Sequence, residues 1–589
     1  MRAPLISKLA IALAITTAAS ASVTATAVAS PAPSGLSAQA LSSRAASVDA
    51  ARSAAFAHAA ETGLTKQSGL VAVDVMVDRD GKQHVRFSQT YGHLPVVGAD
   101  IVVHLAKSSE YLAVTRASDK TVSVPSVVAK VTAEQARDKA AAAVSKGSAA
   151  APRLIVHVQH GKSILAYQVQ VAVNGDAAAS HSVLLDAGTG SEVSDVAALD
   201  GFISPKLENR LKALGEHARP SAGGPSTAAK TPTSAAAYPA PAVGSGLSMY
   251  DGTVTLNTTR TAATTYTLVD STRGSAEVRN AKNKSLAESR VFTGSSAMTD
   301  SDNTWGNGTT SDTNTAGVDA QYGLTSTFDF YKNTFGRNGI RNDGVGPHGA
   351  VHYARNYGNA GWSDGCWCMV YGDGDGVTFT KPLTQLDVTG HELTHGVVSA
   401  TAGLQTDYDA YGDQIGESGS LNESLADIFG SAVEFTTNNA THAPNYLLGE
   451  QLGLSQGFLR RLDHPSLDKL EGAVDYWSTS APQTEVHAGS GVSSHAFYLL
   501  AEGSGSKTIN SVAYNSPTYD GSTVTGIGRD KAVAIFYQAL TRYMVSSTDF
   551  HDARTATLQA AADLYGQGST EYDTVNKAWA AVNVTAANG

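Results

Sequence analysis

The chain has 589 residues, with 42 Lys or Arg against 53 Asp or Glu, which gives a formal net charge of −11. Its length allows roughly three or four domains of average size, and its acidic balance argues against a basic nucleic-acid-binding protein. Hydrophobic residues make up 42% of the chain, and no apolar run approaches the ~20 residues of a membrane-spanning helix. We therefore expect a mature protein with no nucleic-acid partner and no membrane attachment.

The first residues have the order of a secretory signal peptide. Arg2 and Lys8 precede an apolar stretch, and the small-residue sequences at 19–21 and 27–29 both suit signal-peptidase cleavage. We assign residues 1–29 to a signal peptide and expect a secreted protein. A disordered Ala-rich tail is the alternative.

Two small modules and a linker are expected next. Alternating valines over residues 69–124 predict an antiparallel sheet. An Ala-rich helical pattern over 132–145 and strand patterns over 154–185 predict a second α+β module. Residues 218–245 are almost wholly Pro, Ala, Ser, Gly and Thr, a composition that cannot bury enough apolar surface to fold. This segment is predicted to be an exposed linker that is easily cut.

Beyond the linker, the chain divides into a strand-rich part and a helical part. Segments such as 257–268 are rich in Thr, Val and Tyr, which favours strands. From about Asp387 to the C-terminus the pattern is mainly helical. A cleft between two such lobes is a frequent place for an active site.

The clearest chemical motif is His391-Glu392-Leu393-Thr394-His395, within a stretch of helical apolar periodicity. Four residues turn a helix by about 400°, so the two imidazoles lie on one face and can share a tetrahedral zinc ion. Glu392 lies about 100° further round, where it can reach a water on the metal and act as a general base. A chance pair of surface histidines is the alternative, so this motif alone is not decisive.

A second motif offers the third ligand that a catalytic zinc requires. Glu423 and Asp427 are four residues apart on one face of a predicted helix over 419–429, whose other face is apolar. Two inward carboxylates are costly unless they meet a cation or hydrogen-bond donors. Glu423 as ligand and Asp427 as partner of a histidine ring would satisfy both, whereas a solvated helix face is the alternative.

From about residue 245 onward, the chain resembles the thermolysin-like neutral metallopeptidases, which are secreted bacterial zinc endopeptidases. The matching segments stand in the family's order: Val318-Asp319-Ala320, Tyr371 to Gly376, His391 to His395, Gly419 to Phe429, Val486-His487 and Gly526 to Lys531. Upstream, residues 86–96 resemble the fungalysin/thermolysin-type propeptide, and residues 154–193 resemble a PepSY module. The resemblance covers nearly the whole chain.

The resemblance implies an α+β protein: a two-lobed thermolysin-like catalytic domain with zinc in the cleft, preceded by small α+β propeptide modules. The expected parts are a signal peptide (1–29), a fungalysin/thermolysin-type module (30–125), a PepSY-like module (126–200), a linker with the maturation site (201–243), a strand-rich catalytic lobe with the zinc helix (244–395) and a helical lobe (396–589). The propeptide is expected to assist folding and to block the cleft.

The resemblance also implies a catalytic centre. One Zn²⁺ would be held by His391, His395 and Glu423. Glu392 would promote attack of the zinc-bound water on a peptide carbonyl, and His487 would stabilise the oxyanion or donate a proton. Hydrolysis would then take one step, without a covalent intermediate.

Substrate-binding positions follow from the same resemblance. Asn359 and Ala360 match the strand that hydrogen-bonds the substrate backbone, and Arg460 matches the arginine that binds the carbonyl after the scissile bond. The positions that match the lining of the S1′ pocket are Phe379, Leu383, Val388, Leu448 and Leu459. An apolar P1′ residue is the expected preference.

The chain also departs from the family pattern. The aspartate that orients the catalytic histidine in the family is replaced by Pro482, and Glu485, two residues before His487, is the nearest substitute. The family's active-site tyrosine has no clear equivalent, because this chain carries extra residues before Glu417; the candidates are Tyr408 and Tyr411.

The only cysteines, Cys366 and Cys368, cannot supply a disulfide framework. A disulfide between residues so close in sequence closes a small, strained ring. Free thiols and a bond are both open.

Calcium ligands are expected where Asp387, Glu434 and Glu450 match the family's main calcium site, with hard oxygen ligands from separate segments. A further aspartate of that site is Asn445 here. One carboxylate fewer favours one structural Ca²⁺ over two.

We interpret the chain as the secreted zymogen of a zinc-dependent endopeptidase that cleaves protein or peptide substrates. Self-cleavage within 218–245 would release a monomeric enzyme from its own propeptide, which acts as intramolecular inhibitor and chaperone. A secreted metal-bound binding protein with lost or very low turnover is the alternative, suggested by Pro482. Glu392 argues against it, because a purely structural zinc site has no use for a general base. A highly selective processing peptidase would keep the chemistry and differ only in its subsites.

Overall fold

The computed structural model describes residues 38–145, 147–174, 176–214, 238–409 and 411–585. The expected signal peptide and most of the expected linker lie outside these residues. Within the described ranges, no helix is long and apolar enough to cross a membrane.

The two expected propeptide modules share one ten-stranded sheet, in the order β10-β9-β8-β7-β3-β2-β4-β5, with β1 on β2 and β6 on β8. Its strands are β1 Ser68–Val77, β2 Gln83–Tyr91, β3 Leu94–Val97, β4 Ile101–Leu105, β5 Tyr111–Arg116, β6 Gly147–Ala149, β7 Arg153–Gln159, β8 Lys162–Val173, β9 Asp176–Asp186 and β10 Glu192–Ala197. The modules join where β3 and β7 pair in parallel, with Val96 opposite Val156.

Helices cover each half of this sheet through small side chains. The propeptide helices are α1 Ala38–Ala57, α2 Ala59–Thr62, α3 Ala133–Ala143 and α4 Pro205–Leu214. Ala51 and Ala55 of α1 are buried against strands of the first module, and Ala136 and Ala140 of α3 against strands of the second. Each pair is four residues apart, so both methyl groups lie on one helix face and let the helix approach the sheet closely.

The strand-rich lobe is built on two further sheets. A five-stranded sheet has the order β18-β14-β13-β12-β19, and a seven-stranded sheet has the order β11-β21-β22-β20-β16-β15, with β17 on β16. Their strands are β11 Asp200–Gly201, β12 Ala240–Leu247, β13 Thr253–Ala262, β14 Thr265–Thr267, β15 Val269–Asp270, β16 Ala276–Lys284, β17 Ser296–Ala297, β18 Thr299–Asp300, β19 Thr304–Trp305, β20 His348–Tyr353, β21 Ala360–Ser363 and β22 Cys368–Tyr371. The short α5 (Val291–Gly294) and the long α6 (Asn314–Phe335) both pack against β16 and β20.

The expected linker boundaries, 201 and 243, both fall inside regular structure. Gly201 belongs to β11 and Val243 to β12, and α4 lies between them in the chain. The physical reason is apolar burial: Phe202, Leu207 and Leu211 are buried in the same core cluster as the catalytic lobes. The low-complexity composition that predicts a linker begins only after these residues.

The helical lobe carries short hairpins between its helices. Its helices are α7 Leu386–Ser399, α8 Glu417–Thr437, α9 Val486–Gly489, α10 Gly491–Ala501, α11 Arg529–Arg542, α12 Phe550–Tyr565 and α13 Thr570–Ala581. The hairpins are β23 Asp407–Tyr408 with β24 Gln414–Ile415, β25 Leu447–Leu448 with β26 Arg460–Arg461, and β27 Gly505–Ile509 with β28 Val512–Ser516.

Two glycines let α7 and α8 come into close contact. A Cβ on Gly430 would lie 2.8 Å from the carbonyl oxygen of Asp387, and one on Gly390 would lie 3.0 Å from Gly430 Cα. Such distances leave no room for a methyl group between the helices. The close crossing brings together the two helices that carry both chemical motifs.

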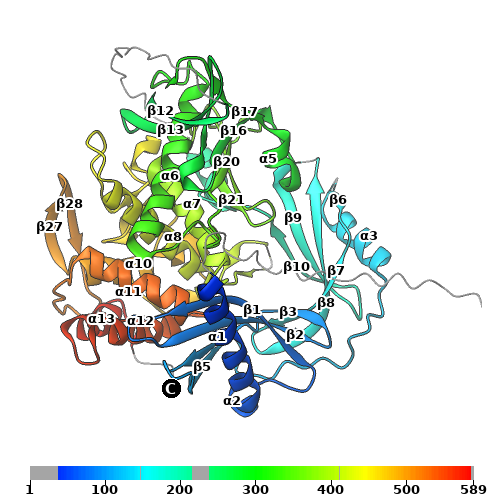
Figure 1. Cartoon of the computed structure of the whole chain (residues 1–589). Helices are drawn as coiled ribbons and strands as arrows, with labels where there is room; N and C mark the ends of the chain where they lie inside the picture. The colour runs from blue at the N-terminus through cyan, green and yellow to red at the C-terminus, as the bar shows by residue number, and fades with distance from the viewer. Residues whose placement is uncertain (1–37, 146, 175, 215–237, 410, 586–589) are drawn as a thin grey trace, which may run out of the picture.

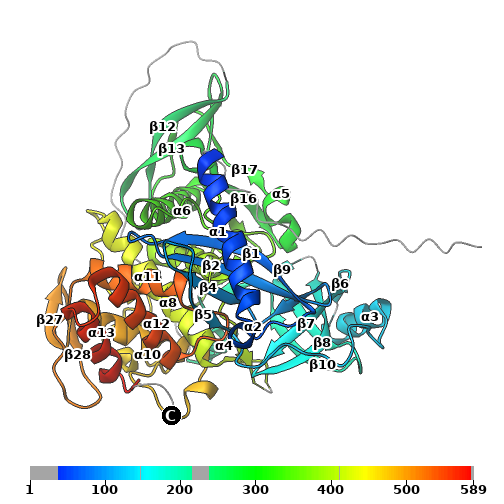
Figure 2. The ribbon, with the colours of Figure 1, turned by 60° about the horizontal axis from the view of Figure 1, so that its bottom comes forward.

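The half of the propeptide sheet that contains β1 to β5 lies against the helical lobe, beside α11 and α12 (Figure 1), and the view in Figure 2 shows the same arrangement. β2 is buried along most of its length because it lies between α1 and the helical lobe. Arg86 of β2 donates to the carbonyl oxygen of Met544 at 2.7 Å, and Arg542 of α11 pairs with Asp78 at 2.6 Å. Charged groups thus fix the propeptide on the catalytic part.

Candidate active site

The histidine motif lies on α7, where 13 of 14 residues are buried. Apolar residues of the same helix, such as Leu393 and Val397, are fully buried with it. The imidazoles of His391 and His395 are one turn apart, and their Nε2 atoms are 3.1 Å from each other. Two ring nitrogens therefore point at one spot inside the protein.

The opposite wall of this spot is α8. Glu423 places one carboxylate oxygen 3.5 Å from His391 Nε2 and the other 3.6 Å from His395 Nε2. One turn further on, Asp427 Oδ1 lies 2.8 Å from His391 Nδ1. The structure thus places Glu423 at the convergence point and Asp427 behind a histidine ring, as expected from their spacing.

His395 also has a partner that the sequence did not reveal. Its Nδ1 lies 3.1 Å from the side-chain oxygen of Asn422. Each candidate ligand histidine therefore has its outer nitrogen held by an oxygen atom. Such contacts fix the ring orientation and the tautomer that binds metal through Nε2.

The three side chains fit a zinc ion. Glu423 Oε2 is buried and makes no hydrogen bond with the described residues. Burial disfavours the charge of Glu423, but His487, His395 and His391 outweigh it and hold its pKa below the usual range. Burial, chiefly, lowers the pKa of His395 to about 4, which keeps Nε2 free to bind a metal. Two imidazoles and one carboxylate leave one coordination position open, as catalytic zinc sites do.

Glu392 faces the strand β21. Its Oε2 accepts a hydrogen bond of 2.9 Å from the backbone N–H of Trp362, and its Oε1 is buried without a partner among the described residues. Burial and the negative charges of Glu423 and Asp200 outweigh the attraction of His391 and raise the pKa of Glu392 well above its usual range. A carboxylate with raised basicity and one free oxygen is suited to take up a proton.

His487 is oriented by Glu485, the substitute expected for the aspartate missing at Pro482. His487 Nδ1 lies 2.7 Å from Glu485 Oε1, and the other oxygen of Glu485 accepts from the backbone N–H groups of His487 and Ala488. Glu485 is thus also the N-cap of α9. Burial opposes the charge of His487, but Glu423 and Glu485 raise its pKa well above the usual value.

Arg460 is held by carboxylates. It donates to both oxygens of Asp427, at 2.8 and 2.9 Å, and to Glu471 at 3.3 Å. Glu471 has no signal in the sequence, because its contact depends on a loop folding back beside β26. The paired carboxylate acceptors hold the planar guanidinium in one orientation.

The candidate substrate-binding residues contact the segment that follows β10. The side chain of Asn359 accepts from Ile203 N at 3.0 Å and donates to Ile203 O at 2.7 Å, and Ala360 O accepts from Phe202 N at 3.2 Å. The expected S1′ residues are all buried in one cluster with Phe202: Phe379, Leu383, Val388, Leu448 and Leu459. The segment around Phe202 and Ile203 occupies the cleft between the two lobes. A cavity of about 170 Å³ remains beside His487.

The two tyrosine candidates differ in position. Tyr408 lines the same cavity as His487, and burial raises its pKa to about 12. Tyr411 is 92% exposed and points away from the protein interior. The cysteines, for which both states were open, are joined as a Cys366–Cys368 disulfide.

The candidate calcium residues form a buried acidic cluster near the start of α7. Both oxygens of Glu434 and one of Glu450 are buried without hydrogen bonds from the described residues. Burial and the charges of Glu450 and Asp387 raise the pKa of Glu434 well above its usual value. Unpartnered carboxylate oxygens of this kind fit a hard cation. Asp387 Oδ2 accepts a hydrogen bond of 2.6 Å from the backbone N–H of Gly449.

His442 was not expected in this cluster. Its Nε2 lies 2.9 Å from Glu450 Oε1, and its Nδ1 lies 3.5 Å from Glu434 Oε1. Asn445, which replaces a family aspartate, donates to the same Glu450 oxygen at 2.8 Å. One side of the cluster is thus occupied by neutral or cationic side chains.

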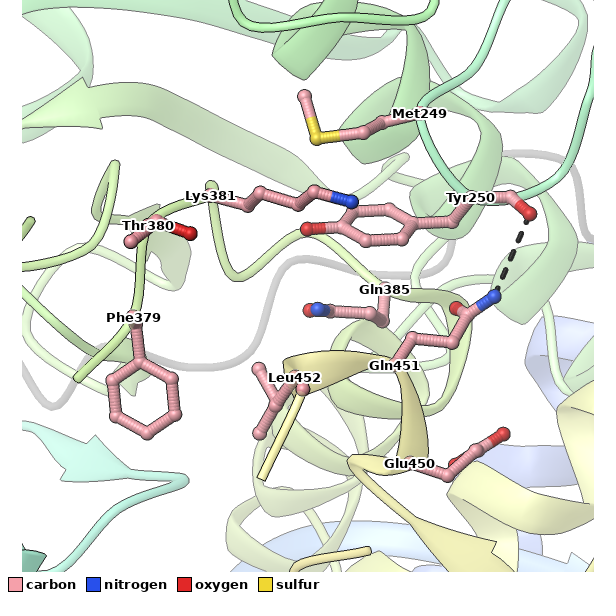
Figure 3. A pocket seen from close by; sticks show the side chains of 10 residues that line it. Met249, Tyr250, Phe379, Thr380, Lys381, Gln385, Glu450, Gln451 and Leu452 are labelled. Carbon is pink, nitrogen blue, oxygen red and sulfur yellow. Dashed lines mark hydrogen bonds between the residues drawn. The ribbon is translucent and has the colours of Figure 1, made fainter. Parts of the chain in front are cut away.

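A cavity of about 260 Å³ lies between this cluster and the expected S1′ residues. Figure 3 shows Lys381 extending along the ring of Tyr250, with its amino group 5.6 Å from the ring centroid. Gln451 donates to the carbonyl oxygen of Tyr250 on the other side. Phe379 and Leu452 also line this cavity.

Three parts of the chain match known families. Residues 243–399 match the thermolysin metallopeptidase catalytic domain, and residues 414–584 match the thermolysin metallopeptidase alpha-helical domain. Residues 68–118 match the fungalysin/thermolysin propeptide motif. The matched ranges coincide with the strand-rich lobe, the helical lobe and β1 to β5.

Relatives of known name are similar over most of this chain. A transglutaminase-activating metalloprotease of Streptomyces mobaraensis is 40% identical over 532 residues, which are 89% of this chain and 62% of the relative, so the chain spans less than two thirds of that protein. A thermolysin of Alicyclobacillus acidocaldarius subsp. acidocaldarius is 32% identical over 534 residues, which are 87% of this chain and 86% of the relative. The solved precursor of protealysin, a metalloproteinase from Serratia proteamaculans, is 29% identical and covers 52% of this chain and 87% of its own, with a TM-score of 0.38.

Proposed function

Because the chain belongs to the thermolysin metallopeptidase family, we propose that it is the zymogen of a secreted, zinc-dependent endopeptidase. The observation that carries this proposal is the convergence of His391, His395 and Glu423 on one buried spot beside Glu392. Substrates are proteins or peptides, and the mature enzyme is a monomer. The propeptide is the enzyme's own inhibitor and folding partner.

His391, His395 and Glu423 would hold the zinc ion. When bound, zinc polarises the substrate carbonyl and lowers the pKa of water. Glu392 accepts the proton of the attacking water through its unpartnered Oε1 and passes it to the leaving nitrogen. His487, held by Glu485, donates a hydrogen bond to the carbonyl oxygen as that oxygen gains negative charge.

Substrate selection rests on β21 and the residues around it. Asn359 and Ala360 bind the substrate backbone, and Arg460 binds the carbonyl that follows the scissile bond. The apolar surroundings of Leu448 and Leu459 support a preference for an apolar P1′ residue. Asp387, Glu434 and Glu450 would hold one structural Ca²⁺.

A binding protein without turnover was the alternative. The reason for considering it was that Pro482 stands where the family has an aspartate that orients the catalytic histidine. Glu485 lies 2.7 Å from His487 and supplies an orienting carboxylate, which removes the main reason for that alternative. A catalytic function therefore explains both Glu392 and His487, whereas a binding function explains neither.

The test is casein hydrolysis by the secreted protein, before and after removal of zinc by a chelator and after its re-addition. We expect activity to be lost with zinc and restored with it. A zinc-loaded mature chain that leaves casein intact would support the binding protein instead.

A further inference from the structure

The residues that end the propeptide lie in the cleft as an added edge strand. β11 pairs antiparallel with β21, so that Asp200 is opposite Trp362 and Gly201 is opposite Gly361. The pairing continues with the 3.2 Å hydrogen bond from Phe202 N to Ala360 O. Peptides that add a strand to a sheet edge are bound in this way, through their backbone.

The backbone carbonyls of this segment meet the two candidate groups that recognise substrate carbonyls. His487 Nε2 lies 3.3 Å from the carbonyl oxygen of Gly201. Arg460 Nη1 donates to the carbonyl oxygen of Phe202 at 3.2 Å. The peptide bond between Gly201 and Phe202 therefore lies between the group that would stabilise an oxyanion and the group that would bind the next carbonyl.

The side chains of the segment suit the same register. Phe202 is fully buried, with its ring edge-on to His391 at 5.0 Å between centroids and the Arg460 guanidinium 4.7 Å from its centroid. The ring packs against Gly449, which has no side chain. A Cβ at that position would lie only 3.3 Å from Phe202 Cε1 and would crowd the ring. On the other side of the bond, a Cβ on Gly201 would lie only 2.9 Å from Asn359 Nδ2, which favours glycine.

We propose that the Gly201–Phe202 bond is the first peptide bond that the precursor hydrolyses, within its own cleft and before the linker is cut. The inference rests on the proposed peptidase function and adds a processing site upstream of the low-complexity segment 218–245, where self-cleavage is expected. Water contributes its oxygen to the carbonyl carbon of Gly201 and a proton to the nitrogen of Phe202. The C–N bond breaks, which leaves a carboxylate on Gly201 and an amine on Phe202.

Both flanks of the bond are anchored, so this cut alone does not release the propeptide. After the bond, Lys206 pairs with Asp413 at 2.9 Å and Arg210 donates to the carbonyl oxygen of Lys469 at 2.9 Å. Before it, Arg86 is bound to Met544 in the helical lobe. The cut chain remains a complex whose cleft is filled, and full activity requires removal of both pieces.

The experiment is a time course of the zinc-loaded, full-length precursor, analysed by intact mass and N-terminal sequencing alongside casein hydrolysis. We expect an N-terminus at Phe202 to appear before casein is hydrolysed, at a rate that does not change when the precursor is diluted tenfold. Gly457–Phe458 is an internal control, because it has the same two residues but lies outside the cleft contacts. That bond should stay intact.

Two variants sharpen the test. Phe202→Leu keeps an apolar side chain and should be cut at a rate near that of the wild type. Phe202→Asp places a charge beside buried apolar groups and should slow this cut by about tenfold or more. Because Phe202 is buried in the core cluster, circular dichroism first checks that each precursor is folded. Phe202→Leu keeps the core apolar, so an intact Gly201–Phe202 bond in this folded variant would by itself contradict the inference.

The outcomes separate this inference from the proposed function. Casein hydrolysis with a cut linker and an intact Gly201–Phe202 bond would overturn the inference and leave the peptidase function standing. A cut rate that rises with precursor concentration would also overturn it, because the cut would then come from another molecule. A chain that cuts neither casein nor itself would overturn both.

Discussion

Glu485 has two tasks that usually fall to different residues. It orients the ring of His487 through Nδ1 and caps the short helix α9 through two backbone N–H groups. A position five residues before His487 is occupied by Pro482, in a short turn without a carboxylate. The carboxylate that orients the ring therefore comes from a residue two positions before His487 and not five, and it still contacts the ring.

This arrangement predicts the effect of Glu485→Gln. The amide still accepts the capping hydrogen bonds, so the fold is kept, but it no longer stabilises the charge on His487. We expect kcat to fall by about 10- to 100-fold with little change in KM. The measurement is steady-state hydrolysis of a peptide, with zinc content as control.

A comparable loss in zinc content would instead assign Glu485 to the metal site. Activity equal to that of the wild type would contradict an orienting role.

At the residue scale, local spacing predicted the positions of His391, His395, Glu423 and Asp427. Such spacing works because one turn of a helix fixes which side chains share a face. Asn422 and Glu471 had no such signal, since each meets its partner only after α8 and the loop after β26 have packed. His442 was missed for the same reason, because it reaches Glu450 across a turn.

At the scale of elements, the contact between α7 and α8 determines the metal site. Gly430 lies against the backbone of Asp387 and His391, where a Cβ would be 2.8 to 3.1 Å from backbone atoms. Backbone atoms cannot move aside as a flexible side chain does. The two helices therefore depend on a residue without a side chain at this crossing.

Gly430→Ala should push α7 and α8 apart. We expect the free energy of unfolding to fall by about 1–3 kcal/mol, as for overpacked cores. Zinc affinity should fall as well, because Glu423 moves away from the two histidines. Denaturant unfolding and a competition assay with a chromogenic chelator measure the two effects.

Unchanged stability and zinc affinity in this variant would contradict the close crossing. The alanine itself is a better helix former than glycine, so a loss can be assigned to the contact and not to helix propensity.

β11 shows where element prediction reaches its limit. The expected division of the chain placed Gly201 in a linker and missed this strand, because only two residues form it and its partner β21 lies about 160 positions away. Pairing between distant segments leaves no periodic signal in so short a stretch. Longer elements such as β2 and α8 were predictable, because their apolar residues recur at strand or helix spacing over many positions.

At the scale of the whole molecule, the contact between propeptide and helical lobe contains a histidine pair. His104 Nδ1 lies 2.7 Å from His84 Nδ1, and the ring of His104 stacks on Tyr543 at 5.2 Å. Burial, followed by the positive charges of His84 and Arg86, lowers the pKa of His104 to about 3.

This pKa predicts acid sensitivity of the precursor. An unfolded histidine has a pKa of about 6.5, so between pH 6.5 and 3 the unfolded chain binds a proton that the folded chain does not. Above pH 6.5 the titration of His104 does not reduce the free energy of unfolding. As the pH falls from 6.5 towards 3, proton binding to the unfolded chain lowers that free energy progressively. Urea unfolding of the precursor at several pH values measures it.

His104→Gln is the matched variant, because it keeps a polar side chain and cannot titrate. Its stability should depend less on pH over the same window. An identical pH dependence in both proteins would contradict a role for His104.

The acidic cluster at Asp387, Glu434 and Glu450 predicts that calcium stabilises the whole catalytic part. Removing the cation leaves buried carboxylates that repel one another. At a calcium concentration of about 100 times Kd, we expect about 2.7 kcal/mol of stabilisation, which is lost on chelation. Thermal unfolding with zinc present and calcium varied measures it.

Glu434→Gln should reduce this calcium dependence, because the amide carries no charge. A melting temperature that does not respond to calcium in the wild type would contradict the site.

The central claim is that Glu392 acts as the base beside a zinc ion held by His391, His395 and Glu423. The most direct measurement compares zinc content and casein hydrolysis of the wild type and Glu392→Gln. We expect equal zinc content in the two proteins, with casein hydrolysis by Glu392→Gln reduced by about 10²- to 10⁴-fold. Undiminished hydrolysis by Glu392→Gln would contradict it.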